Sequence, residues 1–573
     1  MIKITKRIVN TSESKLTKID ELLARIYLAR GITNEQELEL ELNNLLSYHE
    51  LKNIQKSTDL IIFAIKQNEK IVIVGDFDVD GATSTALAIK VLRNLGANVE
   101  YIIPHRIRDG YGLSESVVER VIQLSGKLII TVDNGISSIE AVNLARKNNI
   151  KVLITDHHLP SEALPEADAI LNPNLSNCKF QSKNLCGVGV VFYLMLSVRA
   201  KLKELGYFDN KIRYPNLGSY LDLLALGTVA DVVPLDYNNR ILVHNGLNRI
   251  RAGKGSIGIN ALIEVSDKSF QDITASDLGY LIGPKLNAAG RLEDMSFGVE
   301  LLICQDKFKA FELANKLSQL NQSRKSIEKK MIREAIEILQ TYEEQNRVKK
   351  FIVLFNNNWH QGVSGILASR IKDKYHKPTI IFAEAEDGIL KGSGRSIKGI
   401  HLKNLLDTIN QMNSDIMVSY GGHEMAAGLS IKKDSYDQFC DLFDKTLNKQ
   451  LFPESIFNKE IFTDGSLKEN QITLKTANLL ALSGPWGQSF VEPRFNDLFE
   501  IKDLKVLKDT HLKLELCLLD SHATIPAIAF NVPVEYFELK VGAIIHIVYK
   551  LNENKFRGDT SVQLLIDYIT EPN

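Results

Sequence analysis

The chain has 573 residues, and at roughly 150 residues per domain this length predicts several hydrophobic cores and excludes a small disulfide scaffold. Its 44% hydrophobic and 24% charged residues lie in the globular range, which excludes a disordered or fibrous protein. Lys plus Arg (69) nearly equal Asp plus Glu (70), so any site for a polyanion must be a local patch.

The cysteines and the apolar stretches bear on the compartment. The five cysteines are scattered and contain no C-x-x-C pair, which is typical of a reduced chain. No stretch approaches the ~18 apolar residues needed to cross a bilayer, and the N-terminus lacks the apolar core of a secretory signal. We therefore expect a cytoplasmic protein without a membrane partner.

The first half of the chain changes from a helical to an alternating pattern. Apolar residues at helical spacing predict a helical N-terminal segment over 1–60 that covers the next domain. Short β-branched runs then alternate with helical stretches, which predicts a parallel α/β sheet whose ligands lie beyond the carboxyl ends of the strands. The runs span 71–75, 99–103, 127–132 and 151–155.

The second half predicts three further parts. A strongly charged helical pattern over 305–345 indicates a long connecting helix. A second α/β pattern with glycine-rich turns occupies 346–452. From 453 to 573 the pattern alternates, with Leu512, Leu514 and Leu516 on one face, and this predicts a small β-barrel. The predicted fold class is thus α/β, with a parallel-sheet domain, a connecting helix, a smaller α/β domain and a C-terminal barrel.

Three acids follow the first predicted strand. Asp76, Asp78 and Asp80 occupy alternate positions directly before a predicted helix. Neighbouring carboxylates repel one another unless a cation neutralises them, and hard divalent ions take oxygen ligands. An acidic surface loop or a helix-capping aspartate would explain one such acid, but three together favour a metal.

Other strands deliver similar side chains to the same edge. Asp133 follows the run at 127–132, and Asp156, His157 and His158 follow the run at 151–155. Asp231 lies within an apolar run, where an unpaired carboxylate is costly to bury. A structural histidine remains the alternative for His157. Together these residues fit a two-metal site that activates water for displacement at phosphorus.

The ordered segments carry a resemblance to a known family. GDFDVDG, VDNG, TDHH and GTVADVVPL resemble the DHH phosphoesterase superfamily, and specifically its RecJ-type single-strand-specific exonucleases. Further segments resemble RecJ segments, so the similarity runs from about residue 20 to the end of the sequence. These segments are IPHRIRDGYGL, LCGVGVVF, GPKLNAAGRLED, GSGRS, SYGGHEMAAG and GPWGQSFVEPRF. The resemblance implies a DHH catalytic domain at 61–304, the connecting helix at 305–345, a DHH-associated domain at 346–452 and an OB-fold at 453–573.

The resemblance also implies roles for the acids and histidines. Asp133 would bridge two Mn²⁺ or Mg²⁺ ions, and His158 would face the scissile phosphate and stabilise the charge that develops on it. Many relatives have a histidine where this chain has Val74, so the division of the first two acids between the ions stays open. The implied metal ligands are Asp76, Asp78, Asp80, Asp133, His157 and Asp231, and Asp156 and His158 complete the candidate catalytic set.

Arginines and glycines in the matched segments are candidates for holding DNA. A guanidinium binds two phosphate oxygens, and glycine lets the backbone approach a phosphate closely. Surface salt bridges are the alternative for Arg106 and Arg108. By resemblance, a basic cluster between the two α/β domains holds the 5′ end of the strand. The candidate substrate-binding residues are Arg106, Arg108, Asn287, Arg291, Ser393, Arg395, Gly421, Gly422 and His423.

The function that the resemblance implies is metal-dependent 5′→3′ digestion of single-stranded DNA to 5′-mononucleotides, in recombination and DNA repair including mismatch repair. A single-strand-binding protein and a helicase are the expected partners. One alternative is a DHH phosphodiesterase for very short oligonucleotides or cyclic dinucleotides, which usually lacks the barrel. Another is a non-catalytic single-strand DNA-binding scaffold, although the metal acids are present. An inorganic pyrophosphatase would leave the extra domains without a role.

Overall fold

The computed structural model describes residues 2–9, 15–106, 108–208, 212–344, 349–450, 452–556 and 559–570. Its internal contacts divide the chain into two compact units. The first comprises Met1–Ile4, Arg291–Glu293 and Ser318–Ile461, and the second comprises Thr5–Gly290, Asp294–Leu317 and Phe462–Asn573. Helix α13 (Lys307–Glu344) is the long helix that the sequence predicts, and it contributes residues to both units.

Five parallel strands form the central sheet of the second unit, in the order β3-β2-β4-β5-β6. β3 and β4 flank β2, which makes a topological switch point of the kind where α/β proteins bind ligands. The sequence pattern identified all of these strands except the three-residue β6. The strands are β2 (Ile71–Val74), β3 (Val99–Ile102), β4 (Leu128–Val132), β5 (Lys151–Thr155) and β6 (Ala169–Leu171).

Helices cover both faces of this sheet. On one face, α4 (Glu115–Gln123) and α5 (Ile139–Lys147) pack their buried valines and alanines on the strands. On the other face, α3 (Val79–Asn94) and α6 (Gly187–Glu204) contact the strands and each other. Because both faces are buried, β2 has the sequence IVIV with every residue buried and no polar alternation. The intervening elements before α13 are α7 (Leu221–Ala230), α8 (Tyr237–Arg251), α9 (Ile257–Glu264), α10 (Ala275–Asp277), a π-helical turn (Leu278–Ile282), α11 (Gly283–Leu292) and α12 (Ser296–Ile303).

The N-terminal segment differs from the helical one that the sequence predicts. It contains α1 (Glu21–Leu28) and α2 (Ile54–Lys66), but three short 3-10 turns lie between residues 35 and 50. None of these turns buries a residue, so none has the apolar face that stabilises a longer helix. β1 (Ile2–Lys6) begins the chain and pairs with β12 (Lys459–Thr463).

The two N-terminal helices pack against different parts of the second unit. α2 contacts α6 and β6, so it covers the parallel sheet as expected. α1 instead packs on the segment that leads into the barrel, where Tyr27 stacks on Trp486 and Phe490 with ring centroids 6.1 and 6.2 Å apart. Arg30 also forms a buried salt bridge of 2.8 Å with Asp464. The N-terminal segment therefore joins the sheet to the barrel segment.

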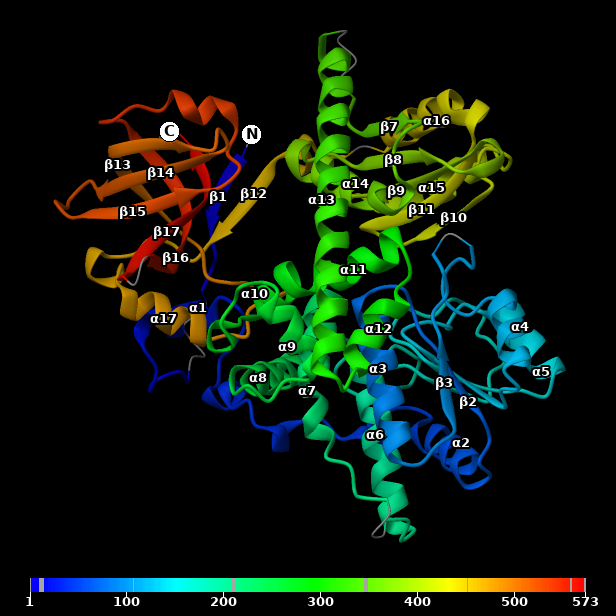
Figure 1. Ribbon diagram of the computed structural model, residues 1–573. Helices are drawn as coiled ribbons and strands as arrows, with labels where there is room; N and C mark the ends of the chain where they lie inside the picture. Colours follow the sequence, from blue (N-terminus) through cyan, green and yellow to red (C-terminus); the bar gives the residue numbers. More distant parts are fainter. Residues whose placement is uncertain are drawn as a thin grey trace. The chain divides into compact units, whose positions relative to one another are not determined.

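A closed barrel forms the C-terminal part of the second unit, with the strand order β13-β14-β15-β17-β16 (Figure 1). In β14 Leu512, Leu514 and Leu516 are buried and Lys513 is exposed, which confirms the predicted alternation. β15 and β17 pair in parallel, and the other described strand pairs of this barrel are antiparallel. The elements are α17 (Leu474–Leu482), β13 (Phe495–Leu507), β14 (His511–Leu518), β15 (Thr524–Ala529), β16 (Ile544–Phe556) and β17 (Asp559–Thr570).

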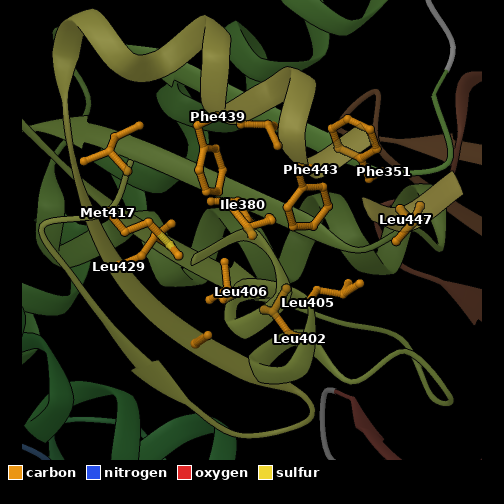
Figure 2. Packing of buried hydrophobic residues seen from close by; sticks show 14 of the residues in the cluster. Phe351, Ile380, Leu402, Leu405, Leu406, Met417, Leu429, Phe439, Phe443 and Leu447 are labelled. Atoms are coloured by element: carbon orange, nitrogen blue, oxygen red, sulfur yellow. The ribbon is translucent and has the colours of Figure 1, made fainter. Parts of the chain in front are cut away.

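The first unit is a second α/β layer structure, with the sheet order β10-β11-β9-β8-β7. Figure 2 shows Phe439 and Phe443 of α16 pointing into a core that also holds Ile380 and Leu405. α13 and α14 bury apolar side chains against the opposite face of the sheet. The elements are β7 (Ile352–Asn356), α14 (Gln361–Tyr375), β8 (Thr379–Glu384), β9 (Ile389–Arg395), α15 (Leu402–Met412), β10 (Ser419–Gly422), β11 (Ala426–Lys432) and α16 (Tyr436–Lys449).

Two observations bear on the cysteine and membrane predictions. The five cysteines are free thiols. Among the helices of the described ranges, none combines the length and the apolar character that a membrane crossing requires.

Candidate active site

The acids and histidines singled out by the sequence meet at the carboxyl edge of the parallel sheet. Asp76 and Asp80 follow β2, and Asp80 lies in the first turn of α3. Asp133 follows β4 in a left-handed conformation with φ of +65°, which aspartate adopts more readily than most residues. Asp231 is the C-cap of α7, so a helix far along the chain completes the cluster.

Their ligand atoms lie close enough together to hold metal ions. His157 Nε2 is 3.1 Å from Asp133 Oδ1 and 3.5 Å from Asp231 Oδ2. The side chains form three groups whose ligand atoms lie within 4.8 Å of one another. The groups are Asp80, His157 and Asp231; Asp76, Asp78 and Asp133; and Asp133, His157 and His158.

The donor atoms fit a divalent cation. Asp133 Oδ1, His157 Nε2 and Asp231 Oδ2 are buried and have no hydrogen-bond partner among the residues that the structure describes. Leaving a buried polar atom unsatisfied costs ~1–3 kcal/mol, more for a charged group, so three such atoms converging on one point indicate a missing partner. Carboxylate oxygens with one imidazole suit Mn²⁺ or Mg²⁺ better than a soft metal. The residues present therefore fit the ions that the sequence predicts.

Burial and mutual repulsion raise the pKa values of the clustered acids. Desolvation by burial, followed by the charge of Asp231, raises the pKa of Asp80 to about 7. Burial, with the charge of Asp78 next, raises the pKa of Asp231 to about 7 as well. The pKa values of Asp76 and Asp133 are raised for the same reasons. A bound cation would remove this repulsion and favour the ionised carboxylates.

The N-terminus of α6 fixes Asp80. The backbone N–H groups of Gly187 and Val188 donate to its two carboxylate oxygens, Oδ2 and Oδ1. The positive end of the helix dipole also favours a carboxylate at this position. The sequence interpretation included the segment LCGVGVVF, which contains Gly187 and Val188, in the resemblance but gave it no role. Its contact with Asp80 joins residues more than a hundred positions apart.

Gly187 leaves no room for a side chain. A Cβ there would lie 2.5 Å from Asp133 Cβ. We expect Gly187→Ala to displace Asp133 and to weaken Mn²⁺ affinity about 10–100-fold, the range seen when groups supporting metal ligands are altered. The measurement is the Mn²⁺ concentration that produces half of the metal-induced rise in melting temperature. Gly189→Ala is the matched control, since its Cβ would meet the flexible side chain of Leu185 at 3.1 Å; an equal loss in both variants would contradict the prediction.

Asp156 and His158 form a pair beside the cluster. His158 Nδ1 lies 2.7 Å from Asp156 Oδ1, which also accepts the backbone N–H groups of His157 and His158. Asp156 Oδ2 accepts the N–H of Ile136 at 3.0 Å. Burial alone would lower the pKa of His158, but the hydrogen bond and charge of Asp156 outweigh it and raise the pKa to about 9. Asp156 is thus occupied in holding His158 as an imidazolium.

A loop after β3 lies over the cluster. The Tyr111 hydroxyl donates to Asp133 O at 3.3 Å and lies 3.5 Å from His158 Nε2. The Arg106 guanidinium stacks 3.8 Å from the Phe77 ring centroid, and burial lowers its pKa although Asp76 and Asp78 oppose this. Sequence analysis missed Tyr111, although the matched segment IPHRIRDGYGL contains it.

Two other substrate candidates of the second unit stand apart from these contacts. Arg108 is exposed, and its backbone N–H lies 3.4 Å from His105 Nδ1. Asn287 is half-buried on α11, where Gly290 approaches Phe77 so closely that a Cβ would lie 1.9 Å from Phe77 O. Neither residue contacts the carboxylate cluster through a hydrogen bond described in this unit.

The first unit gathers a separate set of candidates beside the start of α14. A Cβ on Gly365 would lie 3.2 Å from Arg395 Nη2 and 3.7 Å from Ser393 Oγ, so both side chains meet at this glycine. Arg291 Nη1 donates to Gly362 O at 3.2 Å, one turn earlier. The sequence interpretation did not foresee Gly365, because nothing in HQGVSGILASR shows which side chains approach it.

Glycines of β10 and β11 lie beside Ser393 in the same sheet. Gly421 pairs with Gly428, and Gly428 pairs with Ser393, so the three residues share one face. Apart from the adjoining residues, no heavy atom in the described part of the chain lies within 4 Å of a Cβ built on Gly421 or Gly428, so the backbone is open there. Gly422 has a φ of +143°, which favours glycine, and His423 next to it is exposed.

Comparisons with known proteins agree with this architecture. The model described as the DHH family, N-terminal domain, matches residues 70–228, the DHHA1 domain matches 348–449, and the RecJ OB domain matches 463–568. The single-stranded-DNA-specific exonuclease RecJ of Dickeya dadantii is 48% identical, covering 98% of each chain. The protein of the same name from Escherichia coli is 45% identical, covering 99% of each chain.

Solved structures give the same assignment. The crystal structure of RecJ in complex with Mn²⁺ from Thermus thermophilus has a TM-score of 0.82 and 27% identity, and the match covers all of this chain and 80% of that one. The corresponding complex with Mg²⁺ has a TM-score of 0.76 and 25% identity, covering all of this chain and 79% of that one. Given this similarity over nearly its whole length, the chain belongs to the RecJ family of single-stranded-DNA-specific exonucleases.

Proposed function

We propose that this chain digests single-stranded DNA from its 5′ end in a metal-dependent reaction that releases 5′-mononucleotides. The observation that carries the proposal is the convergence of Asp133, His157 and Asp231, each with a buried atom that has no hydrogen-bond partner within the described ranges. The relatives named above are single-stranded-DNA-specific exonucleases, and the similar crystal structures are complexes with Mn²⁺ and Mg²⁺.

The carboxylate cluster would hold two ions. Asp133 would bridge them, with Asp80, His157 and Asp231 around one ion and Asp76 and Asp78 around the other. When bound, the ions would lower the pKa of a water for attack on phosphorus and offset the negative charge that develops there. This assignment of ligands rests on the three groups of neighbouring side chains and on the unsatisfied atoms.

The chain's own residues would perform the remaining steps. Asp156 holds His158 as an imidazolium, which donates to a non-bridging phosphate oxygen as its charge grows. Arg106, stacked on Phe77, adds a guanidinium with two donors for a neighbouring phosphate. The Tyr111 hydroxyl keeps the loop against Asp133 while the strand is bound. These groups orient the scissile bond; the acid cluster supplies the metal site.

The 5′ end would be held in the first unit. Ser393, Arg395 and Arg291 lie around the start of α14, where the positive end of the helix dipole favours an anion. The open backbone at Gly421 and Gly428 lies on the same face as Ser393. Asn287, Arg108, Gly422 and His423 remain further candidates for contacts along the strand.

Replacing Arg395 by Ala is expected to reduce cleavage of 5′-phosphorylated strands about 10–100-fold, and that of 5′-hydroxyl strands much less, because a charge-assisted hydrogen bond contributes ~1.5–3 kcal/mol. The measurement is kcat/KM on matched strands that differ only at the 5′ end. Arg370→Ala is the control, since its guanidinium in the same unit pairs with Glu328 at 2.9 Å. Equal losses on both substrates would remove Arg395 from the end pocket.

We also propose the wider setting. Catalysis belongs to 61–304, end binding to 346–452 and strand binding to the OB-fold at 453–573, with 1–60 and 305–345 as connections. The protein would serve recombination and DNA repair, including mismatch repair, together with a single-strand-binding protein and a helicase. A cytoplasmic location is part of this proposal and rests on the five free cysteines, which a reducing compartment favours.

The test of function uses purified protein with Mn²⁺ or Mg²⁺ and a single strand of about forty nucleotides, several times the ~4–16 that one OB-fold engages. Parallel reactions carry the label at the 5′ or the 3′ end, with an EDTA control. Immediate mononucleotide release from the 5′ label, with gradual shortening of the 3′-labelled strand, is expected. Binding without cleavage would support the scaffold, and cleavage confined to two or three nucleotides would support the short-oligonucleotide phosphodiesterase.

A further inference from the structure

We propose that two buried asparagines behind the strand ends position different halves of the active site. Asn134 would hold the loop that carries Arg106 and Tyr111 and thereby control strand binding. Asn172 would hold the backbone at His158 and thereby control turnover. The inference rests on the proposed function, because it assigns strand binding to the loop and turnover to His158.

Asn134 joins three segments through one side chain. It directly follows Asp133 and is fully buried. Its Nδ2 donates to Val74 O at 3.1 Å and to Val132 O at 2.9 Å, so it ties the end of β2 to the end of β4. Its Oδ1 accepts the backbone N–H of Leu113 at 3.1 Å, which fixes the end of the loop that carries Arg106 and Tyr111.

The loop depends on this anchor for its place over the cluster. A Cβ on Gly112, which has a φ of +63°, would lie 2.9 Å from Asn134 Cβ, so the loop backbone rests directly on the asparagine. Two further contacts hold the loop. The Tyr111 hydroxyl donates to Asp133 O, and Arg106 Nε donates to Gly290 O at 3.1 Å. Loss of the Leu113 contact would free the C-terminal end of the loop, next to Tyr111.

Asn172 makes a corresponding contact two strands away. It follows β6, is fully buried, and its Nδ2 donates to His158 O at 2.9 Å. Its Oδ1 accepts the N–H of Asn174 at 2.8 Å, and Asn174 Nδ2 in turn donates to His157 O at 2.6 Å. The peptide groups of both histidines are therefore held from behind by amide side chains.

An amide suits these positions better than an acid. Asparagine offers two donors and an acceptor without a charge. Aspartate at either place would lose both N–H donors and would add a buried negative charge without a partner. At these two positions amides therefore hold the backbone without adding a charge.

Loss of each contact is expected to change a different kinetic parameter. Asn134→Ala is expected to raise KM and the dissociation constant for single-stranded DNA in EDTA about tenfold, with kcat changed less than about threefold. Asn172→Ala is expected to lower kcat about 10–100-fold and to leave DNA affinity in EDTA unchanged. Fluorescence anisotropy in EDTA gives affinity without any contribution from cleavage.

Two further variants keep the test decisive. Gly112→Ala disturbs the Asn134 contact from the loop side and should reproduce the rise in KM, even where Asn134→Ala folds poorly. Asn238→Ala removes a buried asparagine that accepts from Tyr193 and Leu46, away from the site, and should change neither parameter.

The possible failures are distinguishable. A wild-type protein that binds but does not cleave single strands overturns the proposed function. If the wild type cleaves single strands but Asn134→Ala and Asn172→Ala change KM and kcat in the same way as each other, the inference is overturned, because a general loss of stability would then explain both variants. A normal KM in both Asn134→Ala and Gly112→Ala would also overturn it.

Discussion

Asp133→Asn is expected to reduce Mn²⁺-dependent cleavage to less than about one-thousandth of the wild-type rate while the fold and DNA binding persist. Asp133 belongs to two of the three groups of possible metal ligands, and its Oδ1 lies 3.1 Å from His157 Nε2. Asparagine keeps the size of the side chain and tolerates the left-handed backbone, with φ of +65°, better than alanine does. Single-turnover cleavage of a labelled strand measures the effect.

The same variant should have a signature without any substrate. Burial and the neighbouring acids raise the pKa of Asp133, so its ionised form destabilises the metal-free protein. In EDTA near neutral pH, Asp133→Asn should therefore melt above the wild type, and the further rise caused by Mn²⁺ should be lost or greatly reduced. Asp168→Asn is the control, because this acid accepts Val152 N at the start of β5, at the opposite end of the sheet. An unchanged Mn²⁺-induced rise in Asp133→Asn would contradict the two-ion assignment.

His158→Ala is expected to lower kcat about 10²–10³-fold with little change in KM, the loss that follows removal of one donor to a developing negative charge. The imidazole is held by Asp156 and is charged at neutral pH, since its pKa is raised to about 9. Because Asp156, rather than a metal ion, occupies Nδ1, the Mn²⁺-induced rise in melting temperature should be kept. Multiple-turnover kinetics and thermal melts measure the two quantities separately.

A matched variant tests whether the removal of any histidine would lower kcat in the same way. His244 lies on α8 and contacts only Asn248 through its ring nitrogen in the described hydrogen bonds, so His244→Ala should retain normal kinetics. If His158→Ala lost metal-induced stabilisation to the same degree as Asp133→Asn, His158 would be a metal ligand instead. The group formed by Asp133, His157 and His158 makes that outcome a real alternative.

Much of the fold follows from local pattern. The β-branched runs at 71–75 and 127–132 became β2 and β4 because both faces of the sheet are covered, which favours continuous apolar strands. The alternation around Leu514 became a barrel strand because one of its faces is buried. Residues 35–50 form short 3-10 turns instead of a helix, and these turns bury none of their residues against the rest of the unit.

Part of the candidate site was also predictable from the sequence. Acids that directly follow parallel strands share one edge of the sheet, so Asp80, Asp133 and His157 were candidates from their position in the sequence alone. The functions of neighbouring side chains were not predictable in this way. Asp156 and His157 are adjacent, yet one is enclosed by hydrogen-bond donors and the other keeps an unsatisfied nitrogen.

By itself, the sequence determined the alternating elements, the acids at the strand ends, the likeness to the RecJ family and hence the type of ions. These properties reside in short segments, where hydrophobic period and residue order are sufficient. Only the tertiary structure decided that Asp231 arrives from α7, that the N–H groups of Gly187 and Val188 fix Asp80, and that Gly365 receives Arg395. The reason is physical: which donor satisfies which oxygen depends on the packing of segments distant in the chain, and no local pattern records it.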